Sequence, residues 1–236
     1  MPQADTLDSP VASLPVWPEG QQLSPGGDPN IAMTHFADAP KFHAALADTI
    51  LKLSRGSEFV EPLVRGSCGT KVHHVNRWGS PEAELVFRRA QSMFCFGLRS
   101  ETATVDASWA SVYKKNDYCV PHSHIRAQAS IVYMVDEGEV DDKDPLSGKL
   151  CFVDPRIPYC AQHEPGRLTR LLIPEMKAGT MVMFPGMLVH SVNPYFGGKP
   201  RITMSWNINV QSLQGDPRQE FYGKIDNAGD KKPAPR

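Results

Sequence analysis

Three histidines and one arginine are the residues of this sequence whose types and spacing most clearly indicate a functional site. His122 and His124 are separated by one residue, His190 follows much later, and Arg201 stands eleven positions (201 − 190) beyond it. Alternate side chains of a β-strand leave on the same face, so His122 and His124 can point into one cavity. Three imidazoles can hold a transition metal with open coordination positions, and a guanidinium nearby can hold an organic anion. The pattern therefore points to a metal-dependent enzyme.

The remaining five histidines (8 − 3) have no comparable set of potential metal ligands near them in the sequence. None of them forms a closely spaced pair whose side chains would share one face of a strand. We expect helix, loop or strand-edge positions without a metal for His35, His43, His73, His74 and His163.

The size and charge of the chain limit the classes of protein to which it can belong. With 236 residues and 26.1 kDa, the chain can build the full core of a single barrel or sandwich. The formal net charge of −1 and the pI near 6.7 give no electrostatic reason to expect a nucleic acid or an anionic membrane as partner. We expect one catalytic domain with extensions.

The cysteines and the N-terminus predict a cytoplasmic protein. The cysteines are odd in number and show no CxxC spacing, which favours reduced thiols over a disulfide frame or a zinc site. The N-terminus lacks the basic stretch and apolar core of a signal peptide. We therefore expect free thiols at Cys68, Cys95, Cys119, Cys151 and Cys160.

The composition divides the chain into three parts. Residues 1–30 are rich in proline, glycine and serine, which predicts a disordered or loosely packed arm. Residues 31–212 should form a single domain, with helical support over residues 38–95 and a β core over residues 105–212. Residues 213–236 are polar and predict a frayed tail.

Periodicity gives the expected elements of this domain. Apolar spacing predicts an amphipathic helix over residues 39–53 and a second one from Pro81 to about Met93 or Phe94, with Ser80 as its cap. From Ser108 onward, short runs rich in β-branched and aromatic residues alternate with turn residues. The fold class is therefore mainly β, an antiparallel sandwich or barrel with supporting N-terminal helices.

Several motifs together carry a resemblance to a known family. The first set is His122, His124, Ser130 and Tyr133, followed by the run from Ser147-Gly148 to Asp154-Pro155-Arg156. The second set is Gly179, Phe184-Pro185, His190, Arg201, Thr203, Ser205 and Asn207. Over residues 108–210 the chain resembles the iron(II)- and 2-oxoglutarate-dependent oxygenases, and most closely a family whose substrates are largely unassigned. Ile125, Ile131 and Thr203 depart from its pattern.

The resemblance implies a fold, reactants and a reaction. The fold is a double-stranded β-helix, which is a jelly-roll or cupin-like barrel, and the reactants are Fe(II), 2-oxoglutarate and O₂. Arg201 would bind the distal carboxylate of 2-oxoglutarate, Thr203 would donate a hydroxyl hydrogen bond to it, and Tyr113 would contact it. The expected outcome is hydroxylation of a substrate C–H bond with release of succinate and CO₂.

The resemblance leaves the third metal ligand open. The wider superfamily has a carboxylate at the position of His124. Asp117 or Asp136 could supply a carboxylate from a neighbouring loop, but neither has the same-face spacing, so we favour His124. Arg126, Tyr133, Asn207 and Arg156 are candidates for contact with the substrate or with the side chains that bind the metal.

Two other classes of protein are alternatives. Gly179, Pro185 and His190 share the spacing of a cupin motif, so a three-histidine dioxygenase or isomerase without 2-oxoglutarate is one of them. Arg201 argues against it, because a cupin needs no such anchor. A non-catalytic β-barrel binding module is the other. The expected partner is a small-molecule substrate, with a protein side chain as an alternative, and a homodimer is a possible assembly.

Overall fold

The computed structural model contains two antiparallel β-sheets whose side chains meet in a common apolar cluster. It describes residues 11, 13–25, 31–61, 66–124, 126–139, 144–153 and 171–211. Within these residues the larger sheet has the strand order β1-β2-β9-β6-β11-β4-β3, and the smaller sheet has the order β5-β10-β7-β8. The mainly β class predicted from the sequence is confirmed.

The strands of each sheet come from distant parts of the chain. The larger sheet contains β1 (Ser24–Pro25), β2 (Ala32–His35), β3 (Thr70–His73), β4 (Thr104–Tyr113), β6 (Ala129–Asp136), β9 (Thr180–Pro185) and β11 (Arg201–Asn209). The smaller sheet contains β5 (Cys119–His122), β7 (Leu150–Val153), β8 (Leu171–Leu172) and β10 (His190–Val192). β11 lies between β4 and β6 and pairs antiparallel with both.

Both predicted helices are present, but the first begins as a 3₁₀ turn and the second extends beyond Phe94 to Leu98. A 3₁₀ turn η1 (Ala39–Lys41) leads into α1 (His43–Leu53), and η2 (Val75–Arg77) precedes α2 (Pro81–Leu98). The Ser80 side chain caps α2 by accepting a hydrogen bond from the Ala83 amide at 3.2 Å. Among the described residues, no helix has the length and apolar character needed to cross a bilayer.

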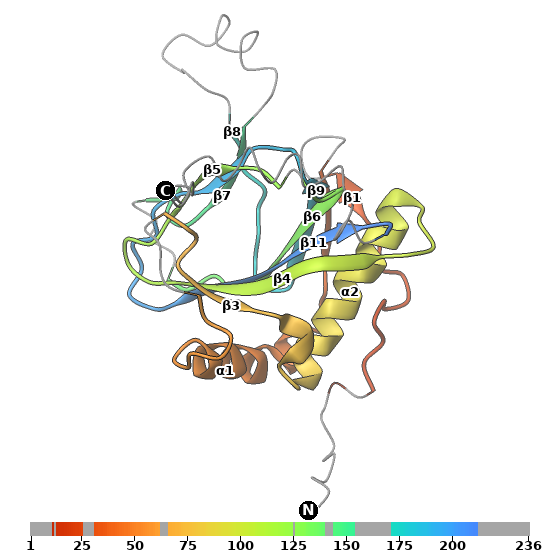
Figure 1. Cartoon of the computed structure of the whole chain (residues 1–236), viewed down its shortest axis with the longest axis horizontal. Helices are drawn as coiled ribbons and strands as arrows, with labels where there is room; N and C mark the ends of the chain where they lie inside the picture. The colour runs from red at the N-terminus through yellow and green to blue at the C-terminus, as the bar shows by residue number, and fades with distance from the viewer. Residues whose placement is uncertain are drawn as a thin grey trace, which may run out of the picture.

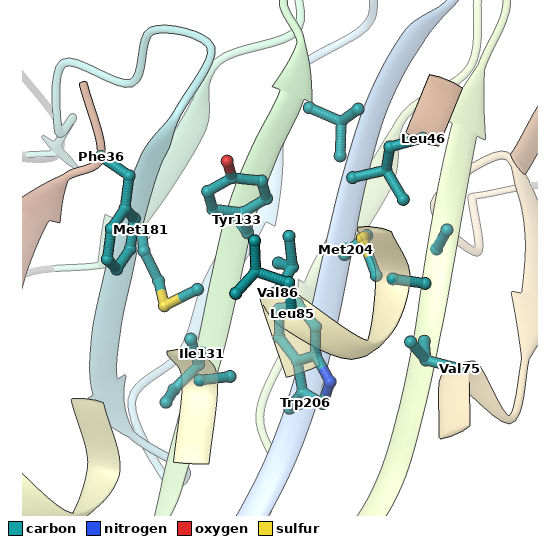
Figure 2. Packing of buried hydrophobic residues seen from close by; sticks show 14 of the residues in the cluster. Phe36, Leu46, Val75, Leu85, Val86, Ile131, Tyr133, Met181, Met204 and Trp206 are labelled. Carbon is teal, nitrogen blue, oxygen red and sulfur yellow. The ribbon is translucent and has the colours of Figure 1, made fainter. Parts of the chain in front are cut away.

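Both helices lie on one side of the larger sheet, and β5 and β7 lie on the other side (Figure 1). Figure 2 shows Leu85 and Val86 of α2 packed among side chains of the sheet, including Ile131 and Trp206. Trp206 is completely buried. Burial of a large apolar side chain contributes roughly 1.5–3 kcal/mol, so this layer supplies much of the stability.

The side chains of β11 alternate between this core and the space between the sheets. On the core side lie Ile202, Met204, Trp206 and Ile208. On the opposite side lie Arg201, Thr203, Ser205 and Asn207, all of which line a cavity. Because successive strand residues point to opposite faces, one strand closes the core and supplies polar groups to the cavity.

Part of the N-terminal arm is packed rather than loose. Trp17 stacks edge-on against Phe36 at a centroid distance of 5.7 Å. The buried Arg89 guanidinium donates to the Pro15 and Val16 carbonyls, each at 3.2 Å, and pairs with Asp38. Residues 13–25 are therefore attached to the domain, although their composition predicts otherwise. The rest of residues 1–30 and the predicted tail 213–236 lie outside the described residues.

The expectation of free thiols throughout is wrong for one pair of cysteines. Cys68 and Cys119 form a disulfide, whereas Cys95 and Cys151 are free, and Cys160 lies outside the described residues. Residues 66–68 run beside β5, with the Cys68 amide donating to the Tyr118 carbonyl at 3.1 Å. This pairing places the two sulfurs together, although 51 positions separate them. Local spacing rules cannot detect such a contact.

His43 is a half-buried histidine on the helix side of the larger sheet. Its Nε2 atom lies 2.6 Å from the Tyr133 hydroxyl, and the two rings meet edge to face. Desolvation by burial is the main cause that lowers the pKa of His43 to about 4. The imidazole is therefore neutral in the folded protein at pH 7.

We predict that His43 makes the folded state sensitive to acid. The unfolded chain binds a proton at His43 near pH 6.5, but the folded chain does so only near pH 4, so stability falls as the pH drops between these values. The expected loss at pH 5 is on the order of 1 kcal/mol, allowing for solvent screening of the half-buried ring. Denaturant unfolding at pH 7.5 and pH 5 should show a smaller loss in His43→Gln, which keeps a polar group but cannot titrate. Equal losses in both proteins would contradict this assignment.

Candidate metal and 2-oxoglutarate site

The three predicted histidines meet between the two sheets. His122 and His190 are directly paired across β5 and β10, with ring centroids 4.3 Å apart. His124 follows the end of β5, and its ring lies 5.0 Å from His122 and 5.1 Å from His190. One nitrogen atom from each ring lies within 4.8 Å of the other two. This spacing suits three ligands of one transition-metal ion.

Backbone carbonyls orient two of the imidazoles. Nδ1 of His122 lies 2.8 Å from the Val120 carbonyl, and Nδ1 of His190 lies 2.9 Å from the Leu188 carbonyl. Since a carbonyl can only accept, both Nδ1 atoms carry the proton, and the Nε2 lone pairs are free. Such outer hydrogen bonds commonly orient histidine ligands toward a metal.

His124 is oriented by a side chain instead. The Asn207 amide lies 3.2 Å from Nδ1 of His124, and its carbonyl oxygen accepts a hydrogen bond from the Ser130 hydroxyl at 3.0 Å. Asn207 therefore contacts a candidate ligand, as its place in the motif suggested. The contact connects β11 and β6 to His124.

Close backbone packing fixes the position of His124 along the chain. The His124 amide donates to the Gly186 carbonyl at 2.7 Å. A Cβ atom at Gly186 would lie 2.1 Å from the Ala127 carbonyl oxygen and 2.6 Å from the His124 carbonyl oxygen. Only glycine fits at this position without a shift of the backbone.

The imidazoles are neutral at physiological pH. Desolvation lowers the pKa of His124 to about 3 and that of His190 to about 4, and it also lowers the pKa of His122. A metal ion binds the neutral form of histidine, so no proton would have to leave these rings at pH 7.

No carboxylate joins the cluster among the described residues. Asp117 instead accepts a hydrogen bond from the Lys114 amide at 2.7 Å, and Asp136 accepts one from the Gly138 amide at 2.8 Å. Neither belongs to a group of side chains close enough to share a metal ion. Within the described part of the chain, the geometry therefore favours His124 over a loop carboxylate.

Arg201 lies in the same cavity as the histidines. Its guanidinium carbon is 4.9 Å from the centre of the Tyr113 ring, and the arginine is 4% exposed. Its Nη1 atom is buried without a hydrogen-bond partner among the described residues. A buried cation with an unused donor is unfavourable unless a ligand completes it, and a carboxylate would do so.

A cavity between the sheets is lined by both polar and apolar side chains. Its polar lining residues are His122, His124, His190, Arg201, Thr203, Ser111, Ser130, Ser205 and Asn207. Its aromatic and apolar lining residues include Trp109, Tyr113, Val132, Leu150, Phe184 and Val192. The cavity therefore combines a metal-binding end with an anion-binding arginine.

Sequence reasoning missed Trp109 and Ser111 as lining residues. Both alternate with Tyr113 along β4, and Ser111 is paired with Thr203. Alternation counted back from Tyr113 would have identified them. The Trp109 ring lies 5.9 Å from the His124 ring, so it forms part of the wall next to the ligands.

Two other candidate residues are not brought to the cavity, and a third is not described. Tyr133 lies in the cluster of apolar side chains on the helix side of the sheet (Figure 2). Its hydroxyl contacts His43 there. Arg126 has an exposed side chain and does not line the cavity. Arg156 lies outside the described residues. The lone histidines that are described, such as His43 and His73, lie outside the three-histidine cluster.

Comparison with known proteins agrees with this geometry. Residues 107–207 match the family model described as "Putative 2OG-Fe(II) oxygenase", and this range contains the three histidines and Arg201. No curated protein sequence matches the chain. The resemblance to this family that the sequence motifs indicated is confirmed.

Solved structures show the same fold. EctD from S. alaskensis, with 2-oxoglutarate and 5-hydroxyectoine, is 15% identical with a TM-score of 0.55, covering 76% of this chain and 72% of its own. A prolyl hydroxylase in complex with a hypoxia-inducible-factor peptide from Trichoplax adhaerens is 11% identical with a TM-score of 0.54, covering 77% and 84%. A prolyl-4-hydroxylase from Pseudomonas putida is 15% identical with a TM-score of 0.52, covering 78% and 89%. The fold is thus a double-stranded β-helix.

We predict that Gly186→Ala weakens metal binding without unfolding the domain. The added methyl group must displace the His124 and Ala127 carbonyls, and this displacement misplaces the His124 ring. Anaerobic titration with Fe(II) should show an affinity at least about tenfold lower, which corresponds to 1.4 kcal/mol. Gly56→Ala is the matched control, because its Cβ would meet only the Leu53 carbonyl at 3.4 Å. Unchanged iron affinity in Gly186→Ala would show that this packing does not position a ligand.

Proposed function

We propose that this chain, whose residues 107–207 match the family model of the 2OG-Fe(II) oxygenases, hydroxylates a C–H bond of a small-molecule substrate. The observation that carries the proposal is one cavity holding three neutral imidazoles and a buried arginine with an unpaired donor. The reaction would consume 2-oxoglutarate and O₂ and release succinate and CO₂.

His122, His124 and His190 would hold the iron. The carbonyl contacts of His122 and His190 leave Nε2 as the ligand atom in both rings. For His124 to offer Nε2 as well, the Asn207 amide would accept from Nδ1 through its oxygen and donate to Ser130. Bound Fe(II) supplies the activation of O₂ that C–H oxidation needs, coupled to decarboxylation of 2-oxoglutarate.

Arg201 would anchor the distal carboxylate of 2-oxoglutarate. Its planar fork matches a carboxylate, and its burial excludes water that would weaken the pair. Thr203 lies on the same face two residues further along β11, where its hydroxyl can donate to the same group. Tyr113 stacks on the guanidinium and limits its movement.

The rest of the cavity would receive the primary substrate. Trp109, Ser205 and Ser130 offer an aromatic face and hydroxyl groups near the histidines. Small molecules and peptides both occur as bound molecules among the similar folds, since one is solved with 5-hydroxyectoine and another with a peptide. The position of the cavity between the two sheets favours a small molecule here. Succinate formation from 2-oxoglutarate over a panel of candidate substrates would identify it.

We predict that Arg201→Ala loses 2-oxoglutarate binding but keeps iron binding. Removal of one partner of a buried charge pair costs about 2–5 kcal/mol, which corresponds to an affinity roughly 30-fold to several-thousand-fold lower. Arg201→Lys should recover only part of the loss, because an ammonium keeps the charge without the fork. Calorimetric titration of 2-oxoglutarate into anaerobic Fe(II) protein measures this effect.

The control for this experiment is Lys199→Ala, which removes an exposed cation two positions away (201 − 199). Equal binding by wild type and Arg201→Ala would reject the anchor. Absence of 2-oxoglutarate binding in the wild type would favour a three-histidine metal enzyme that does not use it.

We predict unequal effects of substitutions at the histidines. His122→Ala and His190→Ala should abolish both iron retention and turnover. His124→Ala should weaken iron binding strongly, whereas His124→Asp should retain part of it, since a carboxylate is a common third ligand for Fe(II). Iron content after anaerobic loading and desalting is the measurement. Full occupancy in His124→Ala would remove His124 from the ligand set.

A further inference from the structure

The Cys68–Cys119 pair lies directly beside the candidate iron ligands. Sγ of Cys119 is 3.6 Å from Nδ1 of His122, and Cys68 lines the cavity that holds the three histidines. The two sulfurs and a His122 ring nitrogen all lie within 4.8 Å of one another. His122 thus belongs to two clusters of potential metal ligands, one made of imidazoles and one containing two sulfurs.

The backbone holds the sulfurs at this place whether or not they are bonded. The Cys68 amide donates to the Tyr118 carbonyl, and the Val120 amide donates to the Gly66 carbonyl at 3.0 Å. Gly69 has a φ of 68° and approaches β4 so closely that a Cβ there would lie 2.5 Å from the Val112 carbonyl oxygen. These contacts restrict the two cysteines to neighbouring positions on one side of His122.

We propose that reduction of this disulfide opens a second metal site, in which Cys68, Cys119 and Nδ1 of His122 bind Zn²⁺. A small dithiol supplies two electrons and two protons; the Cys68–Cys119 bond breaks, two thiols form, and the dithiol becomes a disulfide. Zinc then displaces the two thiol protons and binds both thiolates, with water in its fourth position. Two cysteines and one histidine with an open position are a common ligand set for zinc.

The two metal sites compete for His122. In the present arrangement Nδ1 donates to the Val120 carbonyl, which leaves Nε2 for the imidazole cluster. Zinc at Nδ1 requires the ring proton to move to Nε2 and breaks that hydrogen bond, so Nε2 no longer offers a lone pair to iron. Zinc binds at the sulfur site only in the reduced protein, and there it weakens iron binding by taking His122 from the imidazole cluster. This goes beyond the proposed oxygenase activity, although it uses one of the proposed iron ligands.

Co²⁺ is the probe that separates the two sites, because thiolate ligation gives a sulfur-to-cobalt charge-transfer absorption and imidazole ligation does not. Full-length protein, oxidised or reduced with a dithiol that is then removed without air, is titrated with Co²⁺. The charge-transfer band should appear only in the reduced protein. It should be lost in Cys119→Ser and in His122→Ala, and kept in His190→Ala.

Cys95→Ser is the matched control, since Cys95 is a free thiol on α2, away from both clusters. The band should survive in this variant. Addition of Zn²⁺ should remove the band and protect Cys68 and Cys119 from alkylation, and circular dichroism of the reduced protein verifies that it stays folded.

No oxygenase turnover enters these measurements, so their result is separate from that of the 2-oxoglutarate titration. A reduced, folded wild type without the band would overturn the proposal. So would a band that persists in Cys119→Ser, or one that is equally strong in the oxidised protein.

Discussion

The pairing of β11 with β4 on one side and β6 on the other is the constraint on which the site depends. A strand hydrogen-bonded along both edges cannot slip, since a shift of one residue would turn its core side chains toward the cavity. Trp206 and Met204 would then leave the helices, and Arg201 would enter the apolar core. The free energy of burying the large side chains therefore also holds the arginine in its place.

Desolvation gives the cavity its chemical character. It lowers the pKa of the three imidazoles, so they stay neutral, and it leaves the Arg201 guanidinium with an unused donor. In water the histidines would titrate near their ordinary pKa of 6.5 and would be partly protonated at pH 7, and the guanidinium would be hydrated. The two sheets thus prepare the groups for a cation and an anion by excluding water from both.

Much of this site could be predicted from the sequence because its key features are local or periodic. The one-residue spacing of His122 and His124, the Ser80-Pro81 helix start and the order of motifs from His122 to Asn207 are visible without a structure. Tyr133 was misplaced because the motif was not combined with alternation: it stands three positions after Ser130 and must face the other way. Contacts between distant segments were missed for a different reason. The Cys68–Cys119 bond and the packing of Trp17 depend on tertiary proximity, which composition and spacing do not encode.

The direct pairing of His122 with His190 also has a consequence for how the protein acquires its metal during folding. β5 and β10 are short strands far apart in the sequence, and closing the loop between them costs entropy before their contacts form. The nascent chain holds a histidine pair early, but it has no third imidazole until β10 has joined the smaller sheet. Tight ion capture is therefore a late event in folding, and the ion favours the assembled barrel over partly folded chains by mass action.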